Sequence, residues 1–211
     1  LSAALSARNL ALVEAMGHDT LTTPCPSCLT NLKVAEHKMH KEDFREQVNR
    51  LLDTPVDKNI VTKSVLQMIS EDVGEEEIKK RVKRPLKGLK LACYYGCIMN
   101  RPPEIMQFDD HEHPMSMDNL MEALGAEVLP FPLKVECCGA SFGTTKNHVV
   151  TTLSGKLLAA AESLGVDAVV TACPLCQMNL DLRQGQINRA NNTSYDMPVF
   201  YFTQLIGYAL G

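Results

Sequence analysis

Eight cysteines are the side chains of this sequence that are best suited to chemistry. They occur in short groups: Cys25-x-x-Cys28, Cys93-x3-Cys97, the adjacent pair Cys137-Cys138, and Cys173-x-x-Cys176. Disulfide frameworks spread cysteines along a chain to join distant loops, whereas metal sites bring thiolates together at short spacings. The grouping therefore predicts metal binding, and thiolate ligands favour zinc or an iron–sulfur cluster.

The composition excludes several other functions. A chain of 211 residues, 45% of them hydrophobic, can fill one good core or two small ones. The net charge of -4 and the lack of a dense Lys/Arg stripe give no footprint for phosphate backbones, so nucleic acid is not an expected partner. No apolar run approaches the ~20 residues that cross a bilayer, and no signal peptide is recognisable. We therefore expect a cytoplasmic protein without a transmembrane segment.

An internal repeat organises the chain. Displacing the sequence by 148 positions aligns residues 5–32 with residues 153–180 without a gap, with 13 identities in 28 positions. Each copy predicts a helix (5–16; 153–164) that ends at a glycine, followed by a short strand (21–23; 168–171). A Cys-Pro-x-Cys turn and another helix come next. This turn places the cysteines at the positive end of a helix dipole, which favours thiolate over thiol.

Only the second copy has its upstream half in this sequence. It predicts a strand over 89–94, then Cys97, a helix over 116–124, a strand over 126–129 and the pair Cys137-Cys138. By the repeat offset, the matching pair of the first copy falls about a dozen residues before Leu1. We therefore expect an N-terminally incomplete two-repeat protein.

The predicted fold is α/β, with two pseudo-symmetric repeats of short parallel strands flanked by helices and the first repeat truncated. Residues 1–87 are interpreted as the C-terminal part of the first repeat plus a charged helical connector over 33–87. Residues 88–211 are interpreted as the complete second repeat.

The ligand count of the second copy distinguishes between metals. Five cysteines are grouped there: Cys97, Cys137, Cys138, Cys173 and Cys176. Tetrahedral zinc uses fewer ligands, so zinc explains five thiolates less well than a cluster does. Adjacent cysteines do not easily form an unstrained disulfide, but their thiolates can bind different irons of one cluster.

This constellation resembles the cysteine-rich CCG domain, and the chain as a whole resembles the B subunit of heterodisulfide reductase. The phrases that carry the resemblance are Cys93-Tyr-Tyr-Gly-Cys97, Cys137-Cys138-Gly139-Ala140 and Cys173-Pro-Leu-Cys176-Gln-Met-Asn-Leu. The resemblance implies that the five cysteines of the second copy ligate a noncubane 4Fe–4S cluster. It also implies that Cys25 and Cys28 complete the first motif, which holds either a second such cluster or zinc.

The resemblance further implies an activity and partners. The two sites would face each other across a pocket in which a small disulfide, such as the heterodisulfide of coenzyme M and coenzyme B, is cleaved reductively. Electrons would arrive from the ferredoxin-like C subunit and, behind it, the flavin-containing A subunit of a heterodisulfide reductase complex. One alternative is an electron-transfer component of a lactate, glycolate or glycerol-phosphate dehydrogenase or of a succinate:quinone reductase. Another is a zinc-binding scaffold protein.

Residues near the cysteines have simpler interpretations. On its strand, the Cys93 side chain points the same way as Tyr95 and opposite to Tyr94, which predicts a buried, inert thiol. Lys134 and Glu136 precede the cysteine pair and are candidates for orienting a substrate carboxylate or tuning a potential. Three neighbouring methionines are expected in the core: Met115, Met117 and Met121.

Overall fold

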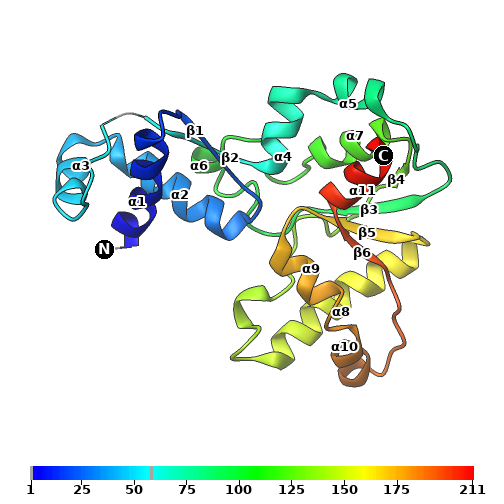
Figure 1. The fold of residues 1–211 in the computed structure, drawn as a ribbon. Coiled ribbons are helices and arrows are strands. Elements are labelled where there is room, and N and C mark those ends of the chain that lie inside the picture. Colours follow the sequence, from blue (N-terminus) through cyan, green and yellow to red (C-terminus); the bar gives the residue numbers. More distant parts are fainter. Residues whose placement is uncertain (1, 58) are drawn as a thin grey trace.

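The computed structural model describes residues 2–57 and 59–211, which contain two parallel sheets (Figure 1). The smaller sheet pairs β1 (Thr20–Thr23) with β2 (Val61–Ser64). The larger sheet has the order β4-β3-β5-β6. Its strands are β3 (Lys90–Tyr94), β4 (Glu127–Leu129), β5 (Ala168–Thr171) and β6 (Val199–Tyr201), and all of their pairings are parallel. The predicted α/β fold is confirmed.

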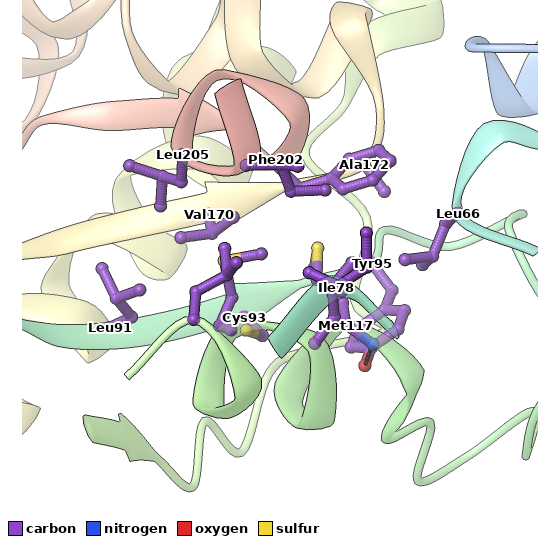
Figure 2. Close-up of a cluster of buried hydrophobic side chains, with 14 of the residues drawn as sticks. Leu66, Ile78, Leu91, Cys93, Tyr95, Met117, Val170, Ala172, Phe202 and Leu205 are labelled. Atoms are coloured by element: carbon purple, nitrogen blue, oxygen red, sulfur yellow. Dashed lines mark hydrogen bonds between the residues drawn. The ribbon is translucent and has the colours of Figure 1, made fainter. Parts of the chain in front are cut away.

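Helices cover both faces of the larger sheet, as is usual for parallel strands (Figure 1). One face packs against α4 (Val65–Met68), α5 (Glu75–Arg81), α7 (Ser116–Ala123) and α11 (Phe202–Leu210). The other face packs against α8 (Asn147–Leu164), α9 (Pro174–Leu180) and α10 (Gln184–Asn191). Side chains of β3 alternate between the two cores: Cys93 belongs to the first and Tyr94 to the second. Figure 2 shows the first core, with Cys93 and Tyr95 among its members.

The smaller sheet belongs to the N-terminal part of the chain. There α1 (Ser2–Ala15), α2 (Pro26–Met39) and α3 (Glu42–Asn49) form a third core around Leu10 and Leu32. The interpretation of residues 33–87 as a helical connector is wrong at β2. This short β-branched run pairs with β1 along its whole length, and tertiary pairing outweighs the helical and charged character of the surrounding sequence.

The other elements of this stretch agree better with the sequence pattern. After β2 come α4, the π-helix η1 (Ile69–Val73) and α5. In α5, Ile78 is buried and the charged residues around it are exposed or partly exposed, with Arg81 and Lys80 paired to Glu77. The predicted solvated helix face is confirmed there.

The two copies of the repeat share backbone details as well as sequence. Thr23 ends β1 opposite Ser64 of β2, and Thr171 ends β5 opposite Tyr201 of β6. In both copies this threonine accepts a hydrogen bond at Oγ1 from the backbone N–H of the first cysteine in the turn, at 3.5 Å from Cys25 and 3.2 Å in the second copy. The duplication inferred from the sequence is therefore also a duplication of structure.

Candidate metal centre

The cysteines of the second copy gather at the carboxyl ends of the central strands. Cys97 follows β3, and Cys173 follows β5. In the order β4-β3-β5-β6, the chain runs from β3 to one side and then crosses to the other, so β3 and β5 border the point at which the winding reverses. Ligands of open α/β sheets bind in the crevice at such a point. The topology therefore places these thiols where the fold offers a site.

All five predicted cysteines of the second copy line one cavity: Cys97, Cys137, Cys138, Cys173 and Cys176. Cys138 and Cys176 are in direct contact, with their sulfurs 3.4 Å apart. Three of the thiols are buried, whereas Cys97 is half-buried and Cys137 is exposed. The cavity is thus closed on the side of the sheet and opens toward solvent near Cys137.

Buried polar side chains fix the position of Cys138. The Ser154 hydroxyl donates a hydrogen bond to the Cys138 carbonyl oxygen at 2.9 Å. The Asn179 amide lies 3.5 Å from the same oxygen and 3.7 Å from the Cys138 sulfur. Both side chains are fully buried, so neither contacts solvent. A donor directed at a thiolate sulfur stabilises its charged form.

Two glycines let the backbone approach the sulfurs. Gly139 has φ +82°, and a Cβ there would lie 3.1 Å from the Val150 Cα atom, so the Cys-Cys-Gly turn packs directly on α8. Gly96 has φ +79°, and a Cβ there would lie 3.2 Å from the Cys176 sulfur. Both the backbone angle and the close contact require glycine.

Cys173 and Cys176 are placed by the start of α9, as the sequence predicts. Cys173 is the N-cap residue, and Pro174 occupies the first turn, where a missing N–H costs nothing. Cys25 is the N-cap of α2 in the same way, with Pro26 behind it.

Hydrogen bonds among the thiols lower the pKa values of some cysteines and raise those of others. The hydrogen bond between the Cys138 and Cys176 thiols is the largest cause that lowers the pKa of Cys138 to about 6 and raises the pKa of Cys176 well above its usual value. The pKa of Cys173 is lowered, again mainly by a hydrogen bond from Cys176. Burial, followed by the neighbouring Cys137, raises the pKa of Cys97 to about 12. Metal binding by these thiols would therefore be coupled to proton release, above all from Cys97 and Cys176.

The first copy faces the same cavity. Pro26 and Ser27, which lie between Cys25 and Cys28, line the cavity together with residues of the second-copy turn. The Tyr201 hydroxyl, at the end of β6, donates a 2.7 Å hydrogen bond to the Pro24 carbonyl and so joins the first-copy turn to the larger sheet. Burial raises the pKa of Tyr201, and the charges of Cys173 and Cys25 raise it further, so the ring lies near both cysteines.

The donor set can be compared with the needs of a single ion and of a cluster. Among residues 2–57 and 59–211, no group of three or more His, Cys, Asp or Glu side chains is arranged to hold one metal ion. The five second-copy sulfurs instead surround a cavity, and they come from separate stretches of chain. Several thiolates around a largely buried space fit an iron–sulfur cluster better than tetrahedral zinc.

A protein-family model matches the stretches of chain that carry these cysteines. The model of the CCG family, a cysteine-rich domain, matches residues 1–33 and 91–181, more than half of the chain. The chain belongs to the CCG cysteine-rich domain family. In this CCG protein the matched stretches include every cysteine of the sequence.

Three curated relatives match this CCG protein over nearly its whole length. The 8-methylmenaquinol:fumarate reductase membrane anchor subunit of Wolinella succinogenes is 36% identical over 210 residues, covering 98% of this chain and 72% of the relative. The B subunit of the ferredoxin/F420H2-dependent CoB-CoM heterodisulfide reductase of Methanosarcina acetivorans is 32% identical, covering 99% and 71%. A protein of Archaeoglobus profundus, named for its likeness to the heterodisulfide reductase B subunit, is also 32% identical, covering 99% and 72%. The predicted relationship to heterodisulfide reductase B subunits is confirmed.

The fold is shared with a protein of solved structure. A hypothetical protein from Helicobacter pylori superposes with a TM-score of 0.75 at 14% identity, and the match covers 99% of this chain and 38% of that one. The helices of the described residues of this CCG protein include none that is both long and apolar enough to span a membrane.

The structure confirms some of the remaining sequence predictions and contradicts others. Cys93 is fully buried in the apolar core, as predicted. Lys134 is buried in an ion pair with Asp118, so its ammonium group is not free to orient a substrate carboxylate. Met117 and Met121 are in the core, but Met115 is 46% exposed and contacts Lys134 through its sulfur.

Sequence reasoning missed the residues that support the cysteines. They are Tyr94, Ser154, Asn179 and Tyr201. The repeat contained a signal for two of them, because Ser154 and Asn179 align with identical residues, Ser6 and Asn31.

Proposed function

We infer that this chain is the iron–sulfur subunit of a heterodisulfide-reductase-like complex that reductively cleaves a small disulfide. The cofactor would be a noncubane 4Fe–4S cluster ligated by Cys97, Cys137, Cys138, Cys173 and Cys176. The observation that carries this proposal is the set of five thiols lining one cavity that opens toward solvent at Cys137. The relationship to heterodisulfide reductase B subunits supports the choice of reaction.

The protein side of the reaction follows from the cavity. When bound, the cluster supplies single electrons and iron atoms that can bind sulfur while a disulfide breaks. The residues around it shield the site from water on the sheet side and hold the sulfurs in place through Ser154 and Asn179. Apolar side chains border the opening: Ile98 and Leu175 are both more than one-third exposed there. They would receive the carbon skeleton of a thiol substrate.

The first copy would form the opposite wall of this substrate site. Residues 1–87 would be the C-terminal part of the first repeat with its connector, and residues 88–211 the complete second repeat. The match of β1, β2 and α4 to β5, β6 and α11 supports this division. Cys25 and Cys28 would ligate a second cluster or zinc together with further ligands, since two thiolates do not complete either site.

Electron-donating partners are part of the proposal. The ferredoxin-like C subunit and the flavin-containing A subunit of a heterodisulfide reductase complex would supply electrons. The curated relatives support a multi-subunit setting because they are named as reductase subunits.

A second candidate is an electron-transfer component of a dehydrogenase or a quinol-linked reductase. The fumarate reductase relative favours this candidate, because its name contains no disulfide. The same cysteine site would then relay electrons without cutting a sulfur–sulfur bond.

Anaerobic metal analysis followed by a reduction assay separates these functions. We expect a brown protein with about four irons and four sulfides for the second-copy site. After reduction with dithionite and removal of excess reductant, the coenzyme M–coenzyme B heterodisulfide should be converted to free thiols at up to one disulfide per two reduced chains, because each disulfide takes up two electrons and two protons and each cluster supplies one electron. Stoichiometric zinc without iron would contradict the cluster and favour a zinc-binding scaffold. A cluster that accepts electrons but never yields thiols from a panel of disulfides would favour the electron-transfer candidate.

A further inference from the structure

Three polar side chains form a closed ring behind the cysteine cavity. The Tyr95 hydroxyl donates a 2.7 Å hydrogen bond to one carboxylate oxygen of Asp118, and the Lys134 ammonium group donates a 2.9 Å bond to the other. The backbone closes the ring, because the N–H groups of Tyr95 and Gly96 donate to the Lys134 carbonyl at 2.8 and 3.1 Å. Tyr95 is fully buried, and Asp118 and Lys134 are 3% and 9% exposed.

The ring joins the two loops that carry the outer thiols of the cavity. Tyr95 lies two residues before Cys97, and Lys134 lies three residues before Cys137. These two cysteines line the same cavity. Neither loop can move away from the other without breaking the ring.

The Lys134 ammonium group is held from several directions. It also donates to the Pro114 carbonyl oxygen at 2.8 Å and lies 5.4 Å from the centre of the Tyr95 ring. The Tyr95 hydroxyl in turn accepts a 2.8 Å hydrogen bond from the Met117 backbone N–H. Figure 2 shows Tyr95 beside Met117 within the apolar core. Each polar atom of the ring therefore has a fixed direction.

Stability alone does not account for a ring of this kind. Burying an ammonium and a carboxylate costs desolvation energy that their attraction often only balances, and apolar residues can replace such pairs without loss of stability. Tyr95 lies in an apolar core, where hydrophobic packing was available, and Lys134 and Asp118 line a cavity that also contains charged side chains. The ion pair and the tyrosine instead fix the relative positions of the groups that they join, because hydrogen bonds restrict geometry more strictly than apolar contacts do.

We propose that the ring of Lys134, Asp118 and Tyr95 positions Cys97 against Cys137 and Cys138, so that the thiols of the two loops can ligate one cluster. All three are positioning residues, since they act through the loops and their hydrogen bonds are made away from the cysteine sulfurs. The inference rests on the proposed function only for the identity of the bound cluster. The spacing of the thiols can be tested without metal.

The variants are Tyr95→Phe, Asp118→Asn and Lys134→Met, with Lys134→Arg as a conservative rescue. Tyr95→Phe removes only a hydroxyl group, so this variant is expected to stay folded. The matched control is Lys63→Met, because Lys63 also pairs with two carboxylates, Glu71 and Asp72, but lies on β2. Thermal unfolding of each variant shows whether the fold is retained.

The first readout is the cluster itself. We expect iron release from the anaerobic protein to a chelator to be about 10- to 100-fold faster in the ring variants, the range found when residues behind metal ligands are changed. The electron paramagnetic resonance spectrum of the cluster should change in the same variants. Lys134→Arg should retain iron nearly as well as the wild type, and Lys63→Met should behave as the wild type.

The second readout needs no metal. Oxidation of the iron-free protein with diamide should give a Cys97–Cys137 disulfide by peptide mapping, and its share should fall in the ring variants but not in Lys63→Met. Unchanged iron release, spectra and disulfide share in folded ring variants would overturn the inference. If the wild type binds no iron, the proposed function fails while the disulfide share still decides the inference.

Discussion

Gly96→Ala is the sharpest test of the cavity geometry, because one methyl group is added beside one sulfur. Gly96 has φ +79°, and the new Cβ would lie 3.2 Å from the Cys176 sulfur. Cys176 is 5% exposed and contacts Cys138, so it cannot move away into solvent. The substitution should therefore strain the backbone and displace a ligand at the same time.

A second glycine separates these two effects. Gly88 has φ +81°, and a Cβ there would meet no atom within 4 Å. A left-handed conformation costs a residue with a Cβ about 1–2 kcal/mol, so both variants should lose that free energy of unfolding. At about 2–4 °C per kcal/mol for a chain of this size, each melting temperature should fall by roughly 2–8 °C.

Only the metal site should distinguish the two variants. Anaerobic Gly96→Ala protein should contain less iron and have weaker visible absorption than the wild type, because Cys176 is moved from its place. Gly88→Ala protein should keep the iron content and the visible absorption of the wild type. Equal iron content in two variants that are equally destabilised would refute the reasoning, since the contact with the Cys176 sulfur would then have no consequence.

Five further substitutions, in three tests, address individual side chains. Cys137→Ala or Cys138→Ala should remove the cluster or alter its magnetic signature, whereas Cys93→Ala should leave iron content nearly unchanged; equal iron loss in all three would show a wrong ligand set. Tyr94→Phe removes the 2.8 Å hydrogen bond to the Glu136 carbonyl, so the free energy of unfolding should fall by about 1–2 kcal/mol in denaturant titrations. Its cluster potential should also shift, because the hydroxyl borders the sulfurs of Cys176 and Cys138. Tyr201→Phe should cost about 0.5–1.5 kcal/mol through the lost bond to Pro24, and thiol labelling of Cys28 should become faster; unchanged labelling would mean that this bond does not hold the first turn.

Much of the fold could be predicted because local signals and tertiary packing agree. The strand over Ala168–Thr171 has the predicted bounds, and β3, β4 and α7 lie within one residue of theirs. The helix α8 was predicted too short at its start, since Asn147–Leu164 begins before the repeated stretch that revealed it. The repeat also predicted that two Cys-Pro-x-Cys turns would occupy equivalent places at the ends of β1 and β5.

The parts that could not be predicted depend on contacts between distant residues. β2 is a strand because β1 offers it a partner, and nothing in its neighbouring charged sequence shows that pairing. Lys134 resembles a substrate-binding lysine until Asp118, on α7, is seen to pair with it. The bond from Tyr201 to Pro24 joins residues 177 positions apart. Cysteine spacing identified the candidate ligands, whereas the residues behind them became visible only in three dimensions.

The pairing of β5 with β3 also determines when the cysteine cavity comes into existence. During translation Cys97 emerges first, and Cys176 follows after roughly 4–16 s at about 5–20 residues per second. Until β5 has docked beside β3, the earlier thiols have no enclosing wall and remain open to oxidation. A cluster would therefore be loaded into a chain that is nearly folded, through the opening at Cys137.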